Sequence, residues 1–510
     1  MPTAVEEVKS LQGKARRRFY EPLAVLEALS FNSERSPSEG IKFREPSIGG
    51  VKGIFKAFVY RLAYVCSSQR GPKTVTSIAV MENDDSFFIV FACNEVNSGQ
   101  GRRISDHIEE LLGKVASASR GQTRSAKACR DNVLKTILLF NRDRVQMYLE
   151  RVVSFATKLL ERISVSPSGT AISESLNGLA SCLRVESLRK STDGDYIRSC
   201  LDCLEKIKRF VKAFSLSPGY DREMATNLNS ESWSELKHCV SRVLAYEEAM
   251  KSLFKAKDEW PQLFESFKIL HIPSSAAQSS PVSHMSRNPD VEAIIGRMTS
   301  DPDDMHAFRE YGRDMQKFDL DERIRQKCTS VRPFMHAEVL VLDWIEREGY
   351  GRGLRFFNDW RYIGCSKPPC RMCAYYFEAC GSYVELRASH GNIYASWQFP
   401  DAHGPEGSAS AKRWRRTLNS MMEKIRLDAF KVMAEKCSAG KKHDSITYDF
   451  RSAWSTRHSQ APGRSIAESV RADDGSESDT AEVGDLLRDR LTLESHDNGD
   501  DDEEDGGALL

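Results

Sequence analysis

The residues of this 510-residue chain that are best suited to chemistry lie in two short motifs. His336 and Glu338 are separated by one residue, and Cys370 and Cys373 form a Cys-x-x-Cys pair directly after Pro369. One imidazole and two thiolates supply the three protein ligands of a catalytic zinc site, which keeps its fourth position for water. The sequence therefore predicts zinc as a cofactor held by His336, Cys370 and Cys373, with Glu338 free for proton transfer.

The ligand set also predicts a catalytic role for Glu338. Two thiolates cancel the formal charge of the zinc ion, so its water is acidified less than among neutral histidines, and a neighbouring base becomes more necessary. A His-x-Glu motif followed by Pro-Cys-x-x-Cys is the known signature of zinc-dependent base deaminases. In that reaction zinc-bound water attacks the amino-bearing ring carbon of cytosine or adenine, Glu338 would shuttle the proton, and ammonia leaves.

Two other interpretations of the cysteine pair remain open. A Cys-x-x-Cys pair with a distant His-x-Glu can be coincidence, or it can belong to a structural zinc site, which normally closes with a fourth Cys or His. Cys365 and Cys380 are the candidates for such a fourth ligand. Ordinary burial of free cysteines in a core is the alternative explanation for both residues.

The neighbouring sequence predicts the elements that position these residues. Apolar residues from Val339 to Ile345 indicate a helix that begins near His336. Tyr362 to Cys365 predict a strand, and Cys370 to Cys380 predict a helix that ends before Gly381. Both thiols of the pair then lie at a helix N-terminus, where the positive end of the helix dipole favours thiolates.

Several further motifs accompany the two zinc motifs. They are Met335-His336-Ala337-Glu338, Tyr362-Ile363-Gly364-Cys365-Ser366-Lys367, Cys370-x-x-Cys373, and Ser389-His390-Gly391-Asn392 followed by Trp397 and Pro400. Together they resemble the zinc-dependent cytidine deaminase-like superfamily, and within it the fungal family of OTT_1508-like deaminases. The resemblance covers about an eighth of the chain. It implies a three-layer α/β fold with a mixed five-stranded sheet, and deaminase activity on a substrate that it does not specify.

Such a sheet needs more strands than the segment after His336 offers. Three strand candidates follow, at residues 361–366, 383–387 and 393–398. A short connection separates the last two, so we expect them to be antiparallel, because parallel strands need a long crossover. Residues 290–332 are charged and helix-like, without the apolar alternation of a strand. Two strands must therefore come from elsewhere in the chain.

A strong hairpin signal lies much earlier. Residues 76–80 and 87–94 are β-branched or aromatic runs separated by turn residues, and an amphipathic helix near 54–62 precedes them. We therefore predict a deaminase domain split by a large all-α insertion. The alternative is an unrelated N-terminal domain, which the chain length allows. The predicted parts are a helix and hairpin at 50–103, the helical insertion at 104–330, the zinc-binding core at 331–440 and a disordered acidic tail at 441–510.

Asn94 ends the second strand of this hairpin. Members of the superfamily often place an asparagine there, where it hydrogen-bonds the base or sugar, so the resemblance implies that Asn94 binds substrate. Asparagine is also common in the turns that follow strands, so a purely structural role for Asn94 stays open. In a split domain Asn94 should lie beside the zinc pocket, although more than 240 residues separate it from His336.

Charge is distributed unevenly along the chain. The 73 basic and 73 acidic residues balance, but residues 466–510 hold 16 acidic and 3 basic ones, which leaves the remainder at net +13. A basic body suits a polyanionic partner, and an acidic tail without aromatic residues cannot bury enough apolar surface to order itself. Thirteen cysteines beside a zinc-thiolate motif indicate an intracellular, cytoplasmic or nuclear location. The sequence has no apolar run long enough to span a membrane, so we expect no membrane partner.

Two functions of different classes follow from these observations. The first is a zinc-dependent hydrolytic deaminase of a cytosine- or adenine-containing nucleoside or nucleic acid. The second is a catalytically inactive deaminase-fold scaffold that binds a protein or a nucleic acid through its helical insertion. Retention of Glu338 together with all three ligands favours the enzyme. The choice of base, the choice between free nucleoside and polynucleotide, and the oligomeric state stay open.

Overall fold

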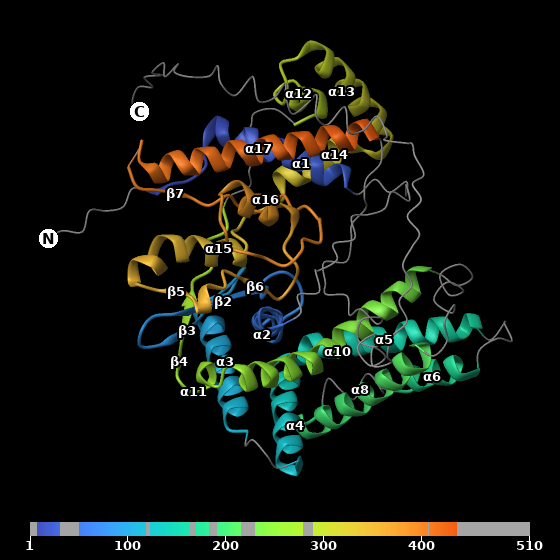
Figure 1. Ribbon diagram of the computed structural model, residues 1–510. Coiled ribbons are helices and arrows are strands. Elements are labelled where there is room, and N and C mark those ends of the chain that lie inside the picture. Colours follow the sequence, from blue (N-terminus) through green and yellow to red (C-terminus); the bar gives the residue numbers. More distant parts are fainter. Residues whose placement is uncertain are drawn as a thin grey trace, which may run out of the picture.

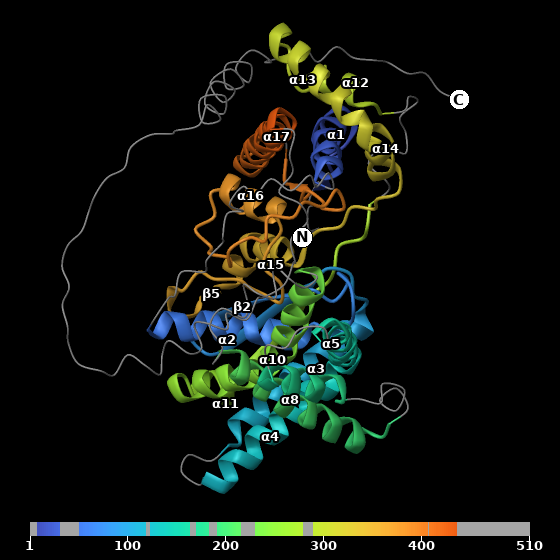
Figure 2. The same ribbon diagram turned by 90° about the vertical axis from the view of Figure 1, so that its right-hand side faces the viewer.

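The computed structural model describes residues 8–30, 50–118, 123–163, 170–182, 191–215, 230–278, 289–405 and 407–435 (Figure 1). The predicted acidic tail at 441–510 lies outside these residues. The described chain has a mixed α/β fold in which one five-stranded mixed sheet is covered by helices on both faces. In Figures 1 and 2 helices α3 to α11 lie at the bottom and α1, α17 and α12–α14 at the top, with the sheet between them. The predicted insertion at 104–330 is therefore not one module, because α12–α14 fall within it but pack on the opposite side of the sheet. Among the described helices, none combines the length and apolar character of a membrane span.

β2 (Thr76–Glu82) is the strand around which the sheet is built. It pairs antiparallel with β3 (Phe87–Cys93) along its whole length. Its other side pairs antiparallel with two short strands, β5 (Arg355–Phe356) and β6 (Gly364–Cys365). β4 (Phe267–Ile272) extends the sheet by pairing parallel with β3. The strands next to the zinc motifs therefore enter the sheet by pairing with the early hairpin.

This pairing confirms the prediction that the early hairpin completes the sheet. The turn has the expected chemistry, because the Asn83 side chain accepts hydrogen bonds from the backbone N–H groups of Asp85 and Ser86. The prediction of an all-α insertion is wrong at β4, which lies within residues 104–330. A six-residue apolar run has no periodicity that distinguishes a short strand from the end of a buried helix. Its parallel pairing with β3 makes this segment a strand in the folded chain.

The predicted antiparallel strand pair at 383–387 and 393–398 is also wrong. The first segment makes a single parallel bridge to Tyr362, and the second a single parallel bridge to Phe334. The connection between them hydrogen-bonds the backbone on both sides of Cys370. The backbone groups that an antiparallel pair would use are therefore engaged with the zinc motifs instead.

The helices from α3 to α11 cover one face of the sheet together with α2. This core includes Ile78 and Val80 of β2, α2 packs directly on β2 and β6, and α10 lies against α2 and α5. The helices are α2 (Val51–Cys66), α3 (Ser98–Ala116), α4 (Thr123–Phe140), α5 (Arg142–Ile163), α6 (Thr170–Ala180), α8 (Asp193–Ser215), α10 (Ser230–Glu259) and α11 (Gln262–Glu265).

A second set of helices covers the opposite face. Ala79 and Met81, which alternate with the residues above, belong to this second core, and α15 packs on β2 and β3. A minor pair of strands, β1 (Val8–Lys9) and β7 (Ala402–His403), borders it. The helices are α1 (Gly13–Leu29), α12 (Val291–Ile295), α13 (Pro302–Asp314), α14 (Leu320–Thr329), α15 (Ala337–Trp344), α16 (Arg371–Ala379) and α17 (Ala409–Glu435), with short turns η1 (Met315–Phe318), η2 (Ile345–Gly349), η3 (Tyr350–Arg352) and η4 (Phe357–Asp359).

Candidate metal centre

His336 and Glu338 are positioned by the start of α15, as the sequence predicts. His336 is the N-cap residue with extended backbone, and its carbonyl accepts the first hydrogen bonds of the helix from Val339 and Leu340. Glu338 lies in the first turn and is only 3% exposed. The helix therefore directs an imidazole and a carboxyl group into the same buried space.

Cys370 and Cys373 are positioned in the same manner by α16. Cys370 is the N-cap residue, and its Sγ accepts a hydrogen bond from the backbone N–H of Cys373 at 3.5 Å. The N-terminus of a helix carries partial positive charge, which stabilises a thiolate. The helix ends at Ala379 with Cys380 as its C-cap residue, and Gly381 follows with a φ of +63°. The predicted bounds of this element are thus confirmed.

The three predicted ligands converge on one point. His336 Nδ1 lies 3.5 Å from Cys370 Sγ and 3.4 Å from Cys373 Sγ, and the two sulfur atoms are 3.5 Å apart. A tetrahedral zinc ion with ordinary Zn–N and Zn–S bonds separates such atoms by about 3.6 to 3.8 Å. The donor set therefore fits zinc in both chemistry and spacing.

The centre has three ligands rather than four. In the described residues, the buried group of close metal-ligating atoms consists of His336, Cys370 and Cys373. Cys380 instead donates to the Phe377 carbonyl, and Cys365 belongs to β6. Neither cysteine joins the group, which argues against a closed structural site and leaves a coordination position for water.

Burial and nearby charge set the protonation of these groups. Burial opposes ionisation of the Cys370 thiol, but a hydrogen bond with Cys373 and the charge of His336 outweigh it and hold the pKa of Cys370 well below its usual range. Burial raises the pKa of the Glu338 carboxyl, although the charge of His336 opposes this. Cys370 is therefore prepared as a thiolate, whereas Glu338 can hold a proton.

Asn94 lies beside the centre, as predicted for a split domain. Its Oδ1 accepts a hydrogen bond from the backbone N–H of Ala337 at 2.8 Å, and its Nδ2 donates to the Pro72 carbonyl at 3.1 Å. Ala337 stands between His336 and Glu338, so this contact fixes the start of α15 to the end of β3. Asn94 is thus a positioning residue, and its predicted contact with substrate remains a prediction.

Trp397 is a site residue whose role the sequence did not reveal. The side chain is 0% exposed, and its indole N–H donates a hydrogen bond to Cys373 Sγ at 3.1 Å. The backbone of residues 396 and 398 pairs with Phe334, two residues before His336. An aromatic residue near a sheet is usually part of the core, so residue type alone gives no signal for an N–H···S contact.

Comparison with known proteins agrees with this geometry. Residues 335–401 match the model of the OTT_1508-like deaminase family. This segment belongs to that family. The OTT_1508-like deaminase segment contains all three ligands, Glu338 and Trp397, whereas Asn94 and the strands β2, β3 and β4 lie outside it. Comparisons with curated proteins and with solved structures gave no match.

Proposed function

We propose that this protein is a zinc-dependent hydrolytic deaminase of a cytosine- or adenine-containing nucleoside or nucleic acid. The observation that carries the proposal is the convergence of His336, Cys370 and Cys373 beside the buried carboxyl of Glu338. Membership of the segment in a deaminase family supports the same reaction class. His336, Cys370 and Cys373 would hold the metal, and Glu338 would move the protons.

The reaction replaces an amino group by a carbonyl group and needs one water molecule. When bound, zinc would supply Lewis acidity that makes water nucleophilic at neutral pH. Glu338 accepts a proton from the attacking water and delivers it to the adjacent ring nitrogen. The added hydroxyl group then gives up its proton, which Glu338 passes to the amino group, so the carbonyl forms and ammonia leaves. The raised pKa of Glu338 suits this role, because an acid–base group works best with a pKa near the working pH.

Replacing the proton carrier while leaving the ligands intact tests this proposal. Glu338→Gln should retain zinc at the wild-type ratio, measured by metal analysis, and should lose ammonia release by a factor of about 100 or more. Glu348→Gln is a matched control, because Glu348 pairs with Arg352 on the surface. The control should keep both zinc and activity. Loss of zinc in Glu338→Gln would contradict its assignment to proton transfer.

The substrate is identified by ammonia release from nucleosides, free bases and single-stranded polynucleotides that contain cytosine or adenine. Release from a panel member assigns the base and its context. A protein that contains zinc but releases no ammonia from any panel member would contradict the proposal and favour the scaffold.

A further inference from the structure

Two arginines are buried where the helical insertion packs against the rest of the molecule. Arg144 on α5 is 3% exposed and Arg242 on α10 is 1% exposed. Two tyrosines, Tyr64 of α2 and Tyr148 of α5, lie against them, with ring centroids 5.2 to 6.0 Å from the guanidinium carbons. We call these four residues the arginine cluster.

The arginine cluster contains no carboxylate. Neither guanidinium forms an ion pair in the described part of the chain. Arg144 donates from Nη1 to the Ser67 carbonyl and also forms a hydrogen bond with the Tyr148 hydroxyl, whereas Nε and Nη1 of Arg242 have no hydrogen-bond partner. Burying a charged group without a counterion or a full set of hydrogen bonds costs several kcal/mol, on the order of the stability of a whole domain. Arg242 is such a group, so an anion bound to its free donors would stabilise the fold.

Two buried carboxylates on the opposite side of the sheet are paired with cations, in contrast to the arginine cluster. Glu21 receives two hydrogen bonds from Arg297, at 2.8 and 3.0 Å. Glu27 receives one from Lys327 at 2.6 Å. The fold therefore provides cations for these two carboxylates, whereas the described residues provide no carboxylate for Arg144, Arg242 or the buried Arg61.

A third cation connects the cluster to the metal centre. Lys367 lies on the loop between β6 and Cys370, and its charge acts to lower the pKa of both His336 and Tyr148. Burial opposes ionisation of the Tyr148 phenol, but Arg242, Arg144 and Lys367 outweigh it and lower its pKa. The largest charge effects on this phenol therefore come from cations.

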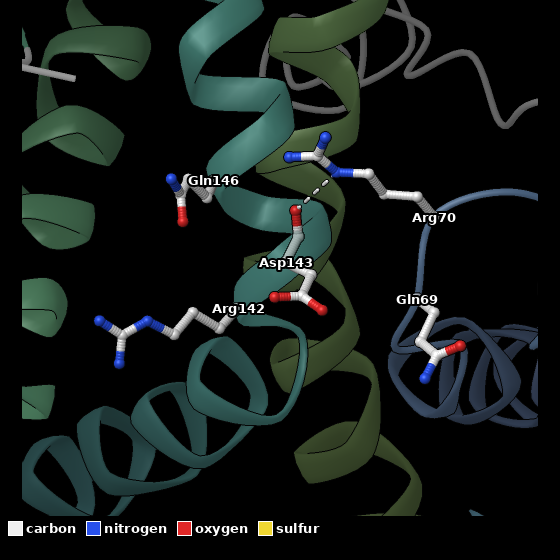
Figure 3. A pocket seen from close by; sticks show the side chains of 5 residues that line it. All are labelled: Gln69, Arg70, Arg142, Asp143 and Gln146. Atoms are coloured by element: carbon white, nitrogen blue, oxygen red, sulfur yellow. Dashed lines mark hydrogen bonds between the residues drawn. The ribbon is translucent and has the colours of Figure 1, made fainter. Parts of the chain in front are cut away.

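A solvent-open cavity of about 560 Å³ adjoins the first turn of α5, which also carries Arg144 (Figure 3). Arg70 crosses it from the loop after α2 and donates from Nε to the Asp143 carbonyl at 3.4 Å. Arg142 also lines the cavity and is held by Asp193 and Ser191. The Asp143 carboxylate is the one acid among the lining residues. Arg142 and Asp143 directly precede Arg144 in α5, so the cavity lies close to the arginine cluster along this helix, although no residue of the cluster lines it.

We propose that the arginine cluster, together with Lys367, binds a phosphate group. Guanidinium groups bind phosphate through two parallel hydrogen bonds, and Arg242 has unused donors for that purpose. The phosphate belongs either to a nucleotide substrate whose base reaches the zinc centre or to free inorganic phosphate. The first source rests on the proposed deaminase function, and the second does not.

The binding is tested on the full chain with inorganic phosphate, against chloride at matched ionic strength. Phosphate should raise the melting temperature of the wild type in a saturable manner. Arg242→Met should weaken the apparent phosphate affinity by about tenfold or more, because it removes a charged donor. It should also melt at or above the wild-type temperature without phosphate, since it removes an unpaired buried charge. Arg151→Gln, which changes an exposed charge on α5, the helix that carries Arg144, should respond like the wild type.

Two results would overturn the proposal. The first is an unchanged melting temperature of the wild type across the phosphate titration. The second is an Arg242→Met protein that has a lower melting temperature than the wild type but an unchanged response to phosphate. That result would show that the cluster contributes only to packing. Should Arg242→Met fail to fold, Lys367→Gln replaces it, because this side chain is partly exposed and its loss should also weaken phosphate affinity.

A second measurement distinguishes the two sources of phosphate. If the site takes the substrate's phosphate, Lys367→Gln lowers the ratio of kcat/KM for a nucleoside 5′-monophosphate to kcat/KM for the nucleoside by about tenfold, and inorganic phosphate competes with the nucleotide. An unchanged ratio with a retained melting response assigns the site to free phosphate. Absence of ammonia from every substrate would contradict the proposed function, while the melting response still decides whether phosphate binds.

Discussion

Cys373 accepts a hydrogen bond that affects how tightly a sulfur-rich site holds zinc. Trp397 donates to its Sγ at 3.1 Å, and this donor favours the thiolate that zinc requires. Trp397→Phe removes the donor but keeps an aromatic ring in the buried space. We expect zinc affinity to fall by about tenfold or more, the usual effect of losing a partner of a metal ligand. Competition for zinc with a chelator at neutral pH measures it.

Trp414 provides the control for this substitution. Its indole N–H donates to the Pro400 carbonyl at 2.8 Å, so Trp414→Phe loses a hydrogen bond of the same donor outside the metal centre. That variant should bind zinc like the wild type. Equal losses of zinc affinity in the two variants would show that general destabilisation, and not the contact with Cys373, is responsible.

Asn94 makes a second prediction at this scale, since it satisfies the backbone N–H between His336 and Glu338. Asn94→Ala leaves that buried donor without its partner and should lower the free energy of unfolding by about 1 to 3 kcal/mol. Zinc affinity should fall as well. Asn97→Ala removes the N-cap of α3 and should cost stability without changing zinc affinity. Wild-type zinc affinity in Asn94→Ala would refute the positioning role.

The ligands and Glu338 could be predicted because zinc chemistry restricts both residue type and spacing. The contacts that hold them could not be predicted in the same way. Trp397 reaches Cys373 by a side-chain hydrogen bond, and Asn94 reaches Ala337 across 243 positions of the chain. Such contacts depend on tertiary packing, which neither residue type nor local periodicity encodes.

At the scale of elements, β6 can lie close to α2 because it contains a glycine. A Cβ at Gly364 would stand 2.6 Å from the backbone nitrogen of Tyr60 and 2.8 Å from the carbonyl carbon of Val59. Backbone atoms cannot rotate away, so Gly364→Ala should lower the free energy of unfolding by about 1 to 3 kcal/mol in urea titrations. Gly351→Ala, where a Cβ meets no atom within 4 Å, should change it by less than about 0.5 kcal/mol. Equal effects of the two substitutions would contradict this packing.

The packing of α3 against α4 makes stability dependent on pH. His107 of α3 is buried and stacks on Phe140 at 3.7 Å between ring centroids. Burial lowers its pKa from 6.5 to about 3, although a backbone hydrogen bond with Val65 opposes this. Below about pH 6.5 the histidine is protonated in the unfolded chain but stays neutral in the folded chain. Protonation therefore lowers the free energy of unfolding by about 1.4 kcal/mol for each pH unit, down to about pH 3.

Replacing His107 by glutamine should remove this pH dependence. Between about pH 6.5 and pH 5, the wild type should lose about 2 kcal/mol of unfolding free energy relative to the variant. Urea unfolding of both proteins at a series of pH values measures the difference. Parallel pH curves for the two proteins would contradict the assignment of the low pKa to His107.

The elements differed in how far the sequence could predict them. α15 and α16 were predicted because caps, apolar periodicity and a terminal glycine agree. β2 and β3 were predicted because two long apolar runs flank a turn. β6 lies within the strand predicted at residues 361–366, although only two of those residues pair. β5 also has two residues, and β4 is a short apolar run after a long helix, so local patterns do not distinguish these two strands. Pairing with β2 and β3 creates these strands.

At the scale of the whole molecule, the sheet joins segments that the insertion separates. β5 and β6 have β2 as their partner, and the start of α15 is fixed by Asn94 at the end of β3. The OTT_1508-like deaminase segment therefore contains the metal ligands but lacks the strands that support them. A zinc centre built this way should depend on both parts of the chain, although all of its ligands come from one.

Dividing the chain between residues 283 and 284 tests this dependence. The fragment 284–510 keeps His336, Cys370 and Cys373 but loses β2, β3 and β4, so we expect weak zinc binding and no cooperative thermal transition. Coexpression with the fragment 1–283 should restore both, because β2 again pairs with β5 and β6 and the large apolar interface is buried again. Val80→Asp in the fragment 1–283 places a charge in the core beneath the sheet and should prevent the restoration. Wild-type zinc affinity with cooperative melting in 284–510 alone would show that the zinc-binding segment folds independently of the early hairpin.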